Sequence, residues 1–206
     1  MTTLPTANQN FLASIRAEAA QRTFHPYGTV RCLGDPLFRN QAARNLGCLL
    51  DVDREVISWT CLPLALENGN DVHIPDFLVE KDHGLVVMDV KQAKARTPPP
   101  WIAHEVAARG YRYASLGADE VSSGYRLRNA VDLLRYSRWH CPLGDRIRLL
   151  AALGEHGTLS VADCFPAFQE TRPIAGLSSL ILNRFVEVDL DEALIGPETS
   201  VRRRRG

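Results

Sequence analysis

Two apolar runs near the middle of the chain form its most distinctive hydrophobic pattern. Residues Ile74 to Val79 and Leu85 to Val90 each have the composition of a β-strand, and the second run is rich in β-branched residues. Lys81 to Gly84, between them, supplies turn chemistry. The pattern predicts an antiparallel hairpin in which the start of the first strand lies beside the end of the second.

Asp76 and Asp89 are polar residues within these two apolar runs, and Lys91 directly follows the second run. Antiparallel pairing brings the two aspartates together, and Lys91 faces the same side as Asp89 because strand side chains alternate with period two. Hard cations such as Mg²⁺ or Mn²⁺ take oxygen ligands, and water and substrate phosphate usually complete their shells. Lys91 could then position or deprotonate the attacking water, or neutralise charge on the phosphate. The layout is typical of a metal-dependent nuclease.

A purely structural explanation of these residues stays open. Asp76 would then follow Pro75 in an edge strand, and Asp89 and Lys91 would form a solvated cross-strand ladder. The signatures of other catalytic classes are missing from the sequence: a phosphate loop, a dinucleotide-binding glycine motif, a nucleophile elbow and an H-E-x-x-H zinc motif. Their absence removes the commonest competitors of the nuclease interpretation.

The carboxy-terminal third has a different pattern. Apolar residues recur at helical spacing in three successive segments with capping or breaking residues at their ends. The predicted helices are residues 145–155, residues 161–168 and a third that begins at Pro173. Residues 185–191 then alternate like a strand, with residues 199–201 as the expected partner. Three short helices followed by a hairpin predict a winged-helix domain.

The third helix of a winged helix usually enters the DNA major groove. Its exposed residues here are expected to be Ser178, Ser179, Asn183 and Arg184. The wing, however, carries acidic residues that would repel phosphate: Glu187, Asp189, Asp191 and Glu192. This conflict favours a protein-docking or mixed role for the domain over the reading of a DNA sequence.

Composition indicates a soluble protein. A chain of 206 residues with 45% hydrophobic and 23% charged residues can bury a sizeable core and hold one domain of about 150 residues plus a small one. No apolar run is long enough to span a membrane, and the first ten residues lack a signal-peptide core. The five scattered cysteines lack C-x-x-C spacing, which is typical of reduced thiols. We therefore expect a cytoplasmic protein with no membrane partner.

A formal net charge of zero gives little support for DNA binding unless the basic residues are clustered. Arginines do cluster on and beside a predicted helix, residues 127–140, and again at residues 202–205. A charged helical face is often simply exposed to solvent, but beside a nuclease site it could bind successive phosphates of the DNA backbone. The candidate nucleic-acid-binding residues are Arg109, Arg112, Arg135, Arg138 and Arg184.

With these motifs in place, the chain resembles the PD-(D/E)xK nucleases and, among them, the TnsA endonuclease subunits of heteromeric transposases. The resemblance covers about residues 24–201 and is most specific over Leu49 to Lys91. It implies an α/β fold, in which a restriction-endonuclease-like mixed sheet flanked by helices (residues 1–141) precedes a small winged-helix domain (residues 142–206). It also implies a Mg²⁺ or Mn²⁺ site at Asp76, Asp89 and Val90, with Lys91 assisting catalysis.

The resemblance further implies the partners of the chain. They are DNA at an element end, an integrase-type transposase subunit and an ATPase regulator. A stand-alone restriction or repair nuclease is one alternative, which cleavage by the purified chain alone would favour. A non-catalytic DNA or protein adaptor is another, which failure to bind Mg²⁺ or Mn²⁺ would favour.

One departure from the family affects the catalytic residues. Family members carry a catalytic glutamate on the helix before Leu49, and the corresponding segment, residues 38–46, has no acid. Gln41 is nearest to the expected position, so it is the fourth candidate catalytic residue, although its amide adds no charge. Glu105 could enter the site from a later helix, or it could be a solvent-facing residue. A catalytically inactive site is the third possibility.

Overall fold

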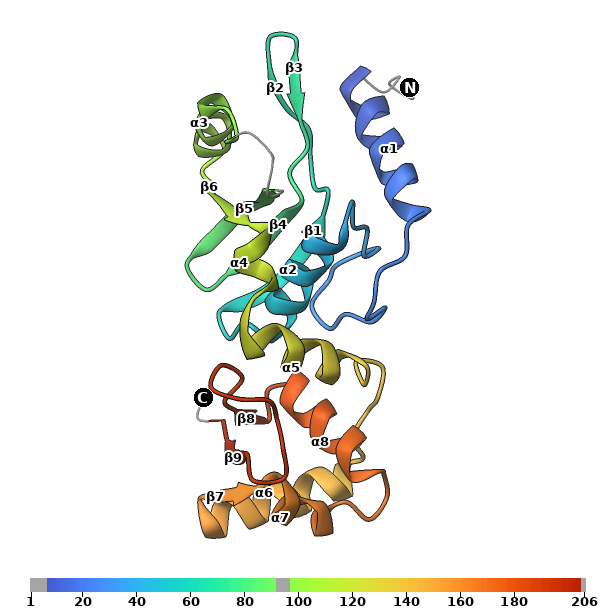
Figure 1. Ribbon diagram of the computed structural model, residues 1–206, viewed down its shortest axis with the longest axis vertical. Coiled ribbons are helices and arrows are strands. Elements are labelled where there is room, and N and C mark those ends of the chain that lie inside the picture. Colours follow the sequence, from blue (N-terminus) through green and yellow to red (C-terminus); the bar gives the residue numbers. More distant parts are fainter. Residues whose placement is uncertain (1–6, 92–96, 205–206) are drawn as a thin grey trace. The chain divides into compact units, whose positions relative to one another are not determined.

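The computed structural model describes residues 7–91 and 97–204, which belong to two compact units (Figure 1). The first unit contains residues 1–25 and 31–122, and the second contains residues 26–30 and 123–206. The boundary expected after residue 141 thus falls inside the second unit. There, helix α5 (Gly124–Leu134) packs on helix α8 (Pro173–Leu182) and so joins the carboxy-terminal unit.

A four-stranded mixed sheet forms the centre of the first unit. Its strand order is β1-β4-β5-β6, and the strands are β1 (Val56–Cys61), β4 (Phe77–Lys81), β5 (Gly84–Lys91) and β6 (Arg112–Gly117). Strands β1, β4 and β5 pair antiparallel, whereas β5 and β6 pair parallel. The parallel pair needs a crossover, which contains helix α3 (Pro100–Ala108).

The predicted hairpin is present as strands β4 and β5. Lys81 pairs with Gly84, and the φ angle of Gly84 is +115°, a conformation that side chains with a Cβ rarely adopt. Ile74, Pro75 and Asp76 precede β4 instead of lying within it, so the first strand starts three residues later than the sequence predicts.

The two faces of this sheet bury separate apolar clusters because successive residues of β5 point to opposite sides. Val86, Met88 and Val90 belong to one cluster, together with residues of helix α2 (Gln41–Val52). Val87 belongs to the other, together with Ile102 and Val106 of α3. The remaining elements of the unit are α1 (Ala7–Ala20), β2 (Leu66–Asn68), β3 (Asp71–His73) and α4 (Ala118–Ser122). Strands β2 and β3 form a separate antiparallel pair.

The second unit combines helices with a small antiparallel sheet of order β7-β9-β8. After α5, its elements are α6 (Leu143–His156), β7 (Thr158–Ser160), α7 (Val161–Cys164), the 3-10 helix η1 (Phe165–Ala167), α8, β8 (Val186–Val188) and β9 (Ser200–Arg203). The helices predicted at residues 145–155 and from Pro173, and the two late strands, are therefore confirmed. The segment predicted as one helix at residues 161–168 is α7 followed by η1, and β7 was not predicted. The helix expected at residues 127–140 instead spans Gly124–Leu134.

Helix α8 lies much deeper in the second unit than its sequence suggests. Ser178 and Ser179, expected to be exposed, retain only 6% and 3% of their accessible surface. Ser179 Oγ accepts a hydrogen bond from the Cys141 backbone N–H at 3.2 Å. The prediction was wrong because it took no account of α5, which contacts α8.

In the part of the chain that the structure describes, no helix is long and apolar enough to cross a bilayer.

Candidate functional site

Asp76 and Asp89 meet at the end of the mixed sheet, as the hairpin predicts. The Asp76 backbone N–H donates to Asp89 Oδ1 at 3.1 Å, so the two residues are in direct contact. The Asp76 carbonyl accepts a hydrogen bond from the Leu62 N–H at 2.9 Å, which fixes the chain just before β4. Both aspartates are buried, with 3% and 5% of their surface exposed. Two buried carboxylates side by side are costly unless other groups compensate them.

Asp89 is held by two side chains from other strands. Its Oδ2 lies 2.7 Å from His73 Nε2, at the end of β3, and accepts a hydrogen bond from the Tyr113 hydroxyl of β6 at 2.8 Å. Burial acts to raise the pKa of Asp89, but the His73 interaction and the Tyr113 hydrogen bond outweigh it and hold the pKa below its ordinary value. Asp89 is therefore an oriented, ionised carboxylate. Burial and the nearby Asp89 charge raise the pKa of Tyr113, so the phenol keeps its proton.

Asp76 has a different environment. Arg39 donates to its Oδ1 through Nε at 2.9 Å and Nη2 at 2.7 Å, and the Val90 backbone N–H donates to Oδ2 at 2.8 Å. Burial nevertheless raises the pKa of Asp76, and the Asp89 charge adds to the increase. The two neighbouring carboxyl groups thus have pKa values shifted in opposite directions, a frequent property of functional sites.

The segment before α2 explains how Arg39 reaches Asp76. Phe38 is buried, and its ring contacts those of Trp59 and Phe77 at centroid distances of 6.1 and 6.3 Å. Gly47 makes room for this ring, because a Cβ there would lie 2.9 Å from the Phe38 side chain. Since Phe77 directly follows Asp76, the packing of Phe38 brings the adjacent Arg39 to the carboxylate pair. The Arg39 Nη2 atom also lies 3.7 Å from Asp89 Oδ1.

Lys91 is the last residue of β5 and is partly buried. It lies two residues after Asp89 in the same strand and therefore on the same face of the sheet. In the parallel pairing with β6, Asp89 is opposite Ser115 and Lys91 is opposite Gly117. Gly117 has no side chain, so no β6 side chain stands opposite Lys91 in this pairing.

Neither substitute for the missing glutamate makes contact with the pair. The Gln41 side-chain amide donates to Asn45 Oδ1 at 2.8 Å along the surface of α2. Glu105 accepts a hydrogen bond from Arg109 Nη1 at 2.7 Å, and both side chains are more than one-third exposed. The structure thus agrees with the solvent-facing interpretation of Glu105. Arg39, from the segment that precedes α2, is the side chain that reaches Asp76.

The donor set suits a hard divalent cation. Among residues 7–91 and 97–204, no group of three or more His, Cys, Asp or Glu side chains is arranged to hold a metal ion. Mg²⁺ usually binds through one or two carboxylates and takes its other ligands from water and phosphate. Asp76 and Asp89 are two neighbouring carboxylates that could bind in this way, and the carbonyl of Val90 is the third ligand that the family resemblance implies. A metal ion would have to replace the Arg39 guanidinium at Asp76 Oδ1.

The arginines predicted to bind nucleic acid are divided between the two units. In the first unit, Arg109 bonds to Glu105, and Arg112 is exposed on β6. In the second, Arg135 and Arg138 are exposed beyond α5, where Arg135 lies 3.4 Å from Asp132. Arg184 follows α8 and adopts a φ angle of +62°. Each of these residues is at least partly accessible to solvent.

Sequence reasoning missed three side chains that organise the site, Arg39, His73 and Tyr113. Tyr113 lies in β6 two residues before Ser115, which pairs with Asp89. Correct prediction of this parallel pairing would therefore have placed Tyr113 near Asp89. His73 precedes Asp76 by three residues, but its direction depends on the separate β2-β3 pair. No local pattern in the sequence identifies Arg39.

No known protein-family model matches the chain, and no curated protein sequence matches it significantly.

Proposed function

We propose that the first unit is a metal-dependent DNA endonuclease with a restriction-endonuclease-like fold, and that the chain is the strand-cleaving subunit of a heteromeric transposase. The observation that carries the proposal is the contact between Asp76 and Asp89 at the end of a mixed sheet, with Lys91 on the same strand as Asp89. The order of α2, β1, β4, β5, α3 and β6 supports the fold. The resemblance of Leu49–Lys91 to TnsA proteins supports the biological role.

In this proposal, Asp76, Asp89 and the Val90 carbonyl hold Mg²⁺ or Mn²⁺. The bound ion supplies Lewis-acid polarisation of the phosphodiester and lowers the pKa of a bound water. Asp89 is kept ionised and oriented by His73 and Tyr113. Lys91 orients or deprotonates the attacking water, or offsets charge on the phosphate oxygens.

The second unit supports the assignment through the order of its elements. Helix α6, strand β7, helices α7 and α8, and strands β8 and β9 follow one another as in a winged helix, and β9 lies between β7 and β8. We propose that this unit joins the nuclease to its target complex. The proposed partners are an integrase-type transposase subunit, an ATPase regulator and DNA.

A strand-cleavage assay tests the proposal. The purified chain is incubated with a duplex that carries an element end, with and without the integrase-type partner, in Mg²⁺ or Mn²⁺. The expected result is partner-dependent hydrolysis of one strand, which EDTA abolishes. Efficient cleavage by the chain alone would favour a stand-alone restriction or repair nuclease.

A specific observation favours one other candidate, a non-catalytic adaptor of the same fold. The Arg39 guanidinium already supplies a positive charge to Asp76 and lies near Asp89. If this ion pair is permanent, Mn²⁺ cannot displace it and cleavage is absent under all conditions. Calorimetric titration with Mn²⁺ distinguishes the two candidates, because only the nuclease binds the ion.

A further inference from the structure

The third helix of a winged helix usually faces the DNA, but α8, the third helix here, is poorly placed to do so. Most of this helix is buried, including Ser178 and Ser179 near its centre. Asn183, at its carboxy-terminal end, donates its side-chain N–H to the Ser179 carbonyl at 2.8 Å and so caps the helix. The helix therefore offers few polar side chains for contact with base edges.

The acids of the predicted wing are partly engaged within the unit. Asp189 Oδ1 accepts the backbone N–H groups of Asp191 and Glu192 at 2.7 and 3.0 Å. Asp191 forms an ion pair with Arg126 at 2.7 Å. These contacts shape the loop after β8 and reduce the repulsion that its sequence suggests.

Another surface of this unit is strongly basic. Arg202 of β9 lies between Thr158 of β7 and Glu187 of β8 in the strand pairing. Arg203 and Arg204 follow, and in the described part of the chain none of the three arginines forms a side-chain ion pair. Arg205 lies outside the described residues. Arg202 and Arg203 are consecutive strand residues and therefore point to opposite sides of the sheet, so the three arginines surround the end of β9. We name this surface, formed by Arg202, Arg203 and Arg204, the β9 arginine face.

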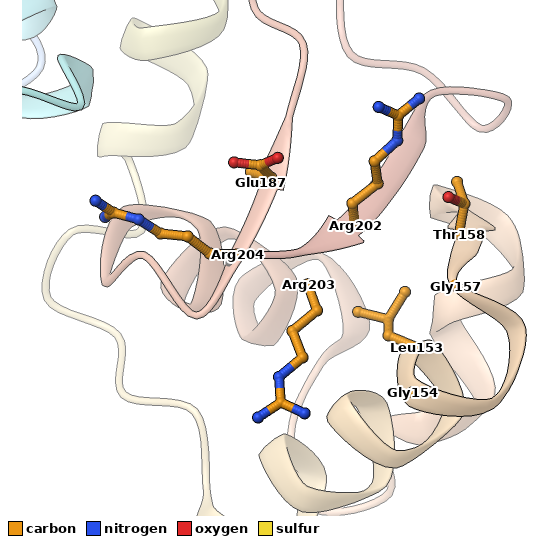
Figure 2. A pocket seen from close by; sticks show the side chains of 8 residues that line it. All are labelled: Leu153, Gly154, Gly157, Thr158, Glu187, Arg202, Arg203 and Arg204. Atoms are coloured by element: carbon orange, nitrogen blue, oxygen red, sulfur yellow. The ribbon is translucent and has the colours of Figure 1, made fainter. Parts of the chain in front are cut away.

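The β9 arginine face borders an open hollow of about 900 Å³. The end of α6 contributes Gly154 and Gly157 to its wall, and Glu187 is the acidic residue among those that line it. Figure 2 shows the three guanidinium groups extending in different directions from β9 instead of converging on one point. Charges spread in this way suit an extended chain of phosphates better than a single small anion.

The chemistry of the hollow favours nucleic acid over protein. Protein interfaces usually contain apolar or aromatic anchors. Leu153 is the apolar side chain among the lining residues, and only 2% of its surface is exposed. The lining carries three arginines and one glutamate, so its net charge is positive. A positive lining favours phosphate, which guanidinium groups bind through paired hydrogen bonds.

We infer that the β9 arginine face binds the phosphodiester backbone of DNA independently of sequence. The inference rests on the proposed function for the choice of DNA as the polyanion. It places the DNA contact of the second unit on its sheet, whereas a winged helix usually presents its third helix to the DNA major groove. The unit thereby holds the substrate, while cleavage takes place in the first unit.

Two sets of variants of the full chain test this inference, all carrying Asp89→Asn and measured in EDTA so that cleavage does not interfere. The first set compares Arg202→Gln/Arg203→Gln/Arg204→Gln with the charge-matched control Arg22→Gln/Arg54→Gln/Arg172→Gln, three exposed arginines that are not candidate nucleic-acid contacts. The second compares Gly154→Glu with Gly154→Ala. A Cβ at Gly154 meets no atom within 4 Å, so the Cβ of either variant fits, and Gly154→Glu adds a negative charge beside the hollow.

Binding of a labelled duplex of mixed sequence is followed by fluorescence anisotropy at several KCl concentrations. Each lost phosphate contact should reduce the slope of log K against log salt by about 0.9. The slope of the β9 triple variant should therefore fall by up to about 2.7, and its affinity for DNA should fall at least about tenfold. The control triple should change less. Gly154→Glu should weaken binding, and Gly154→Ala should stay within about twofold of the parent.

Unchanged DNA binding by both the β9 triple and Gly154→Glu would overturn the inference, as would an equal or larger loss in the control triple. Loss of binding to poly-glutamate with DNA binding intact would assign the surface to an acidic protein instead. If the β9 triple fails to fold, as shown by its thermal melt, the Gly154 pair decides. Because binding is measured without metal, a failure of the nuclease proposal would appear separately, in the cleavage assay.

Discussion

Each unit of the protein buries aspartate carboxylates, but the two environments differ in kind. In the second unit, Asp145 is completely buried and accepts the backbone N–H groups of three consecutive residues, Gln169, Glu170 and Thr171, at 2.9 to 3.3 Å. Arg148 adds a charged hydrogen bond. Burial acts to raise the pKa of Asp145, but these donors outweigh it and lower the pKa. One carboxylate thus ties α6 to the loop before α8.

The first unit instead brings two buried aspartates together and surrounds their carboxylates mainly with side chains. The side chains of His73, Tyr113 and Arg39 can rotate and exchange partners, whereas the backbone donors around Asp145 cannot. The pKa of Asp76 is raised and that of Asp89 is lowered, although both are buried. A structural carboxylate needs only fixed donors. A paired site with adaptable neighbours is better suited to exchanging protein donors for a metal ion and substrate.

The largest expected effect is on cleavage. Under the proposed function, Asp89→Asn removes the charge of a metal ligand but almost no volume, so metal-dependent cleavage should fall more than about 100-fold, beyond the usual cost of losing a residue that only orients a ligand. Cleavage of element-end DNA in Mn²⁺ with the partner transposase measures this loss. Retained cleavage would remove Asp89 from the site.

Stability provides the matched control for that substitution. The new amide can donate to His73 or Tyr113, both of which can accept, so Asp89→Asn should lower the free energy of unfolding by no more than about 1 kcal/mol. Urea denaturation measures the change. A cooperative loss of structure in Asp89→Asn would mean that its lost activity reflects unfolding.

Lys91→Gln should lower the cleavage rate by about 100-fold, the smaller end of the range for general acid–base groups. Mn²⁺ affinity should change little, because the proposed function gives Lys91 a role toward the water or the phosphate and not as a ligand. Cleavage assays and calorimetric titration separate these two effects. A variant that cleaves at the parent rate would contradict the role given to Lys91.

Asp145→Asn should lower stability and leave metal binding unchanged, the opposite of what is expected for Asp89→Asn. Its amide would face backbone N–H groups that can only donate, so the free energy of unfolding should fall by about 3 kcal/mol while Mn²⁺ affinity stays unchanged. Because folding lowers the pKa of Asp145, its contribution is fully present above the unfolded pKa of about 4 and is lost as pH falls through the folded pKa. Urea melts of parent and variant from pH 7 to pH 3 should therefore converge at low pH.

The smallest expected effects are changes in Mn²⁺ affinity caused by substitutions at Arg39 and Gln41. Removing its charged hydrogen bonds to Asp76 in Arg39→Gln should tighten Mn²⁺ binding about 5- to 10-fold. Gln41→Glu should change it less, because Gln41 bonds to Asn45 and not to the pair. Calorimetric titration of both variants tests this order. A larger gain for Gln41→Glu would place Gln41 at the glutamate position of the family.

The hairpin and the contact between Asp76 and Asp89 could be predicted because alternation and a two-residue turn are local properties of the sequence. Long-range packing determined what could not be predicted. Arg39 reaches Asp76 through the burial of Phe38 against Trp59 and Phe77, and no periodicity marks that segment. The burial of α8 likewise depends on α5, which is distant in sequence.

The position of a bound metal ion tests the central claim most directly. Crystals of the protein soaked in Mn²⁺ are measured at the manganese absorption edge, and an anomalous difference map locates the ion. The account predicts one peak that contacts both Asp76 and Asp89, with the Arg39 side chain displaced from Asp76. No peak at this pair, with Arg39 still bound to Asp76 at high Mn²⁺ concentration, would contradict the assignment of a metal-dependent nuclease.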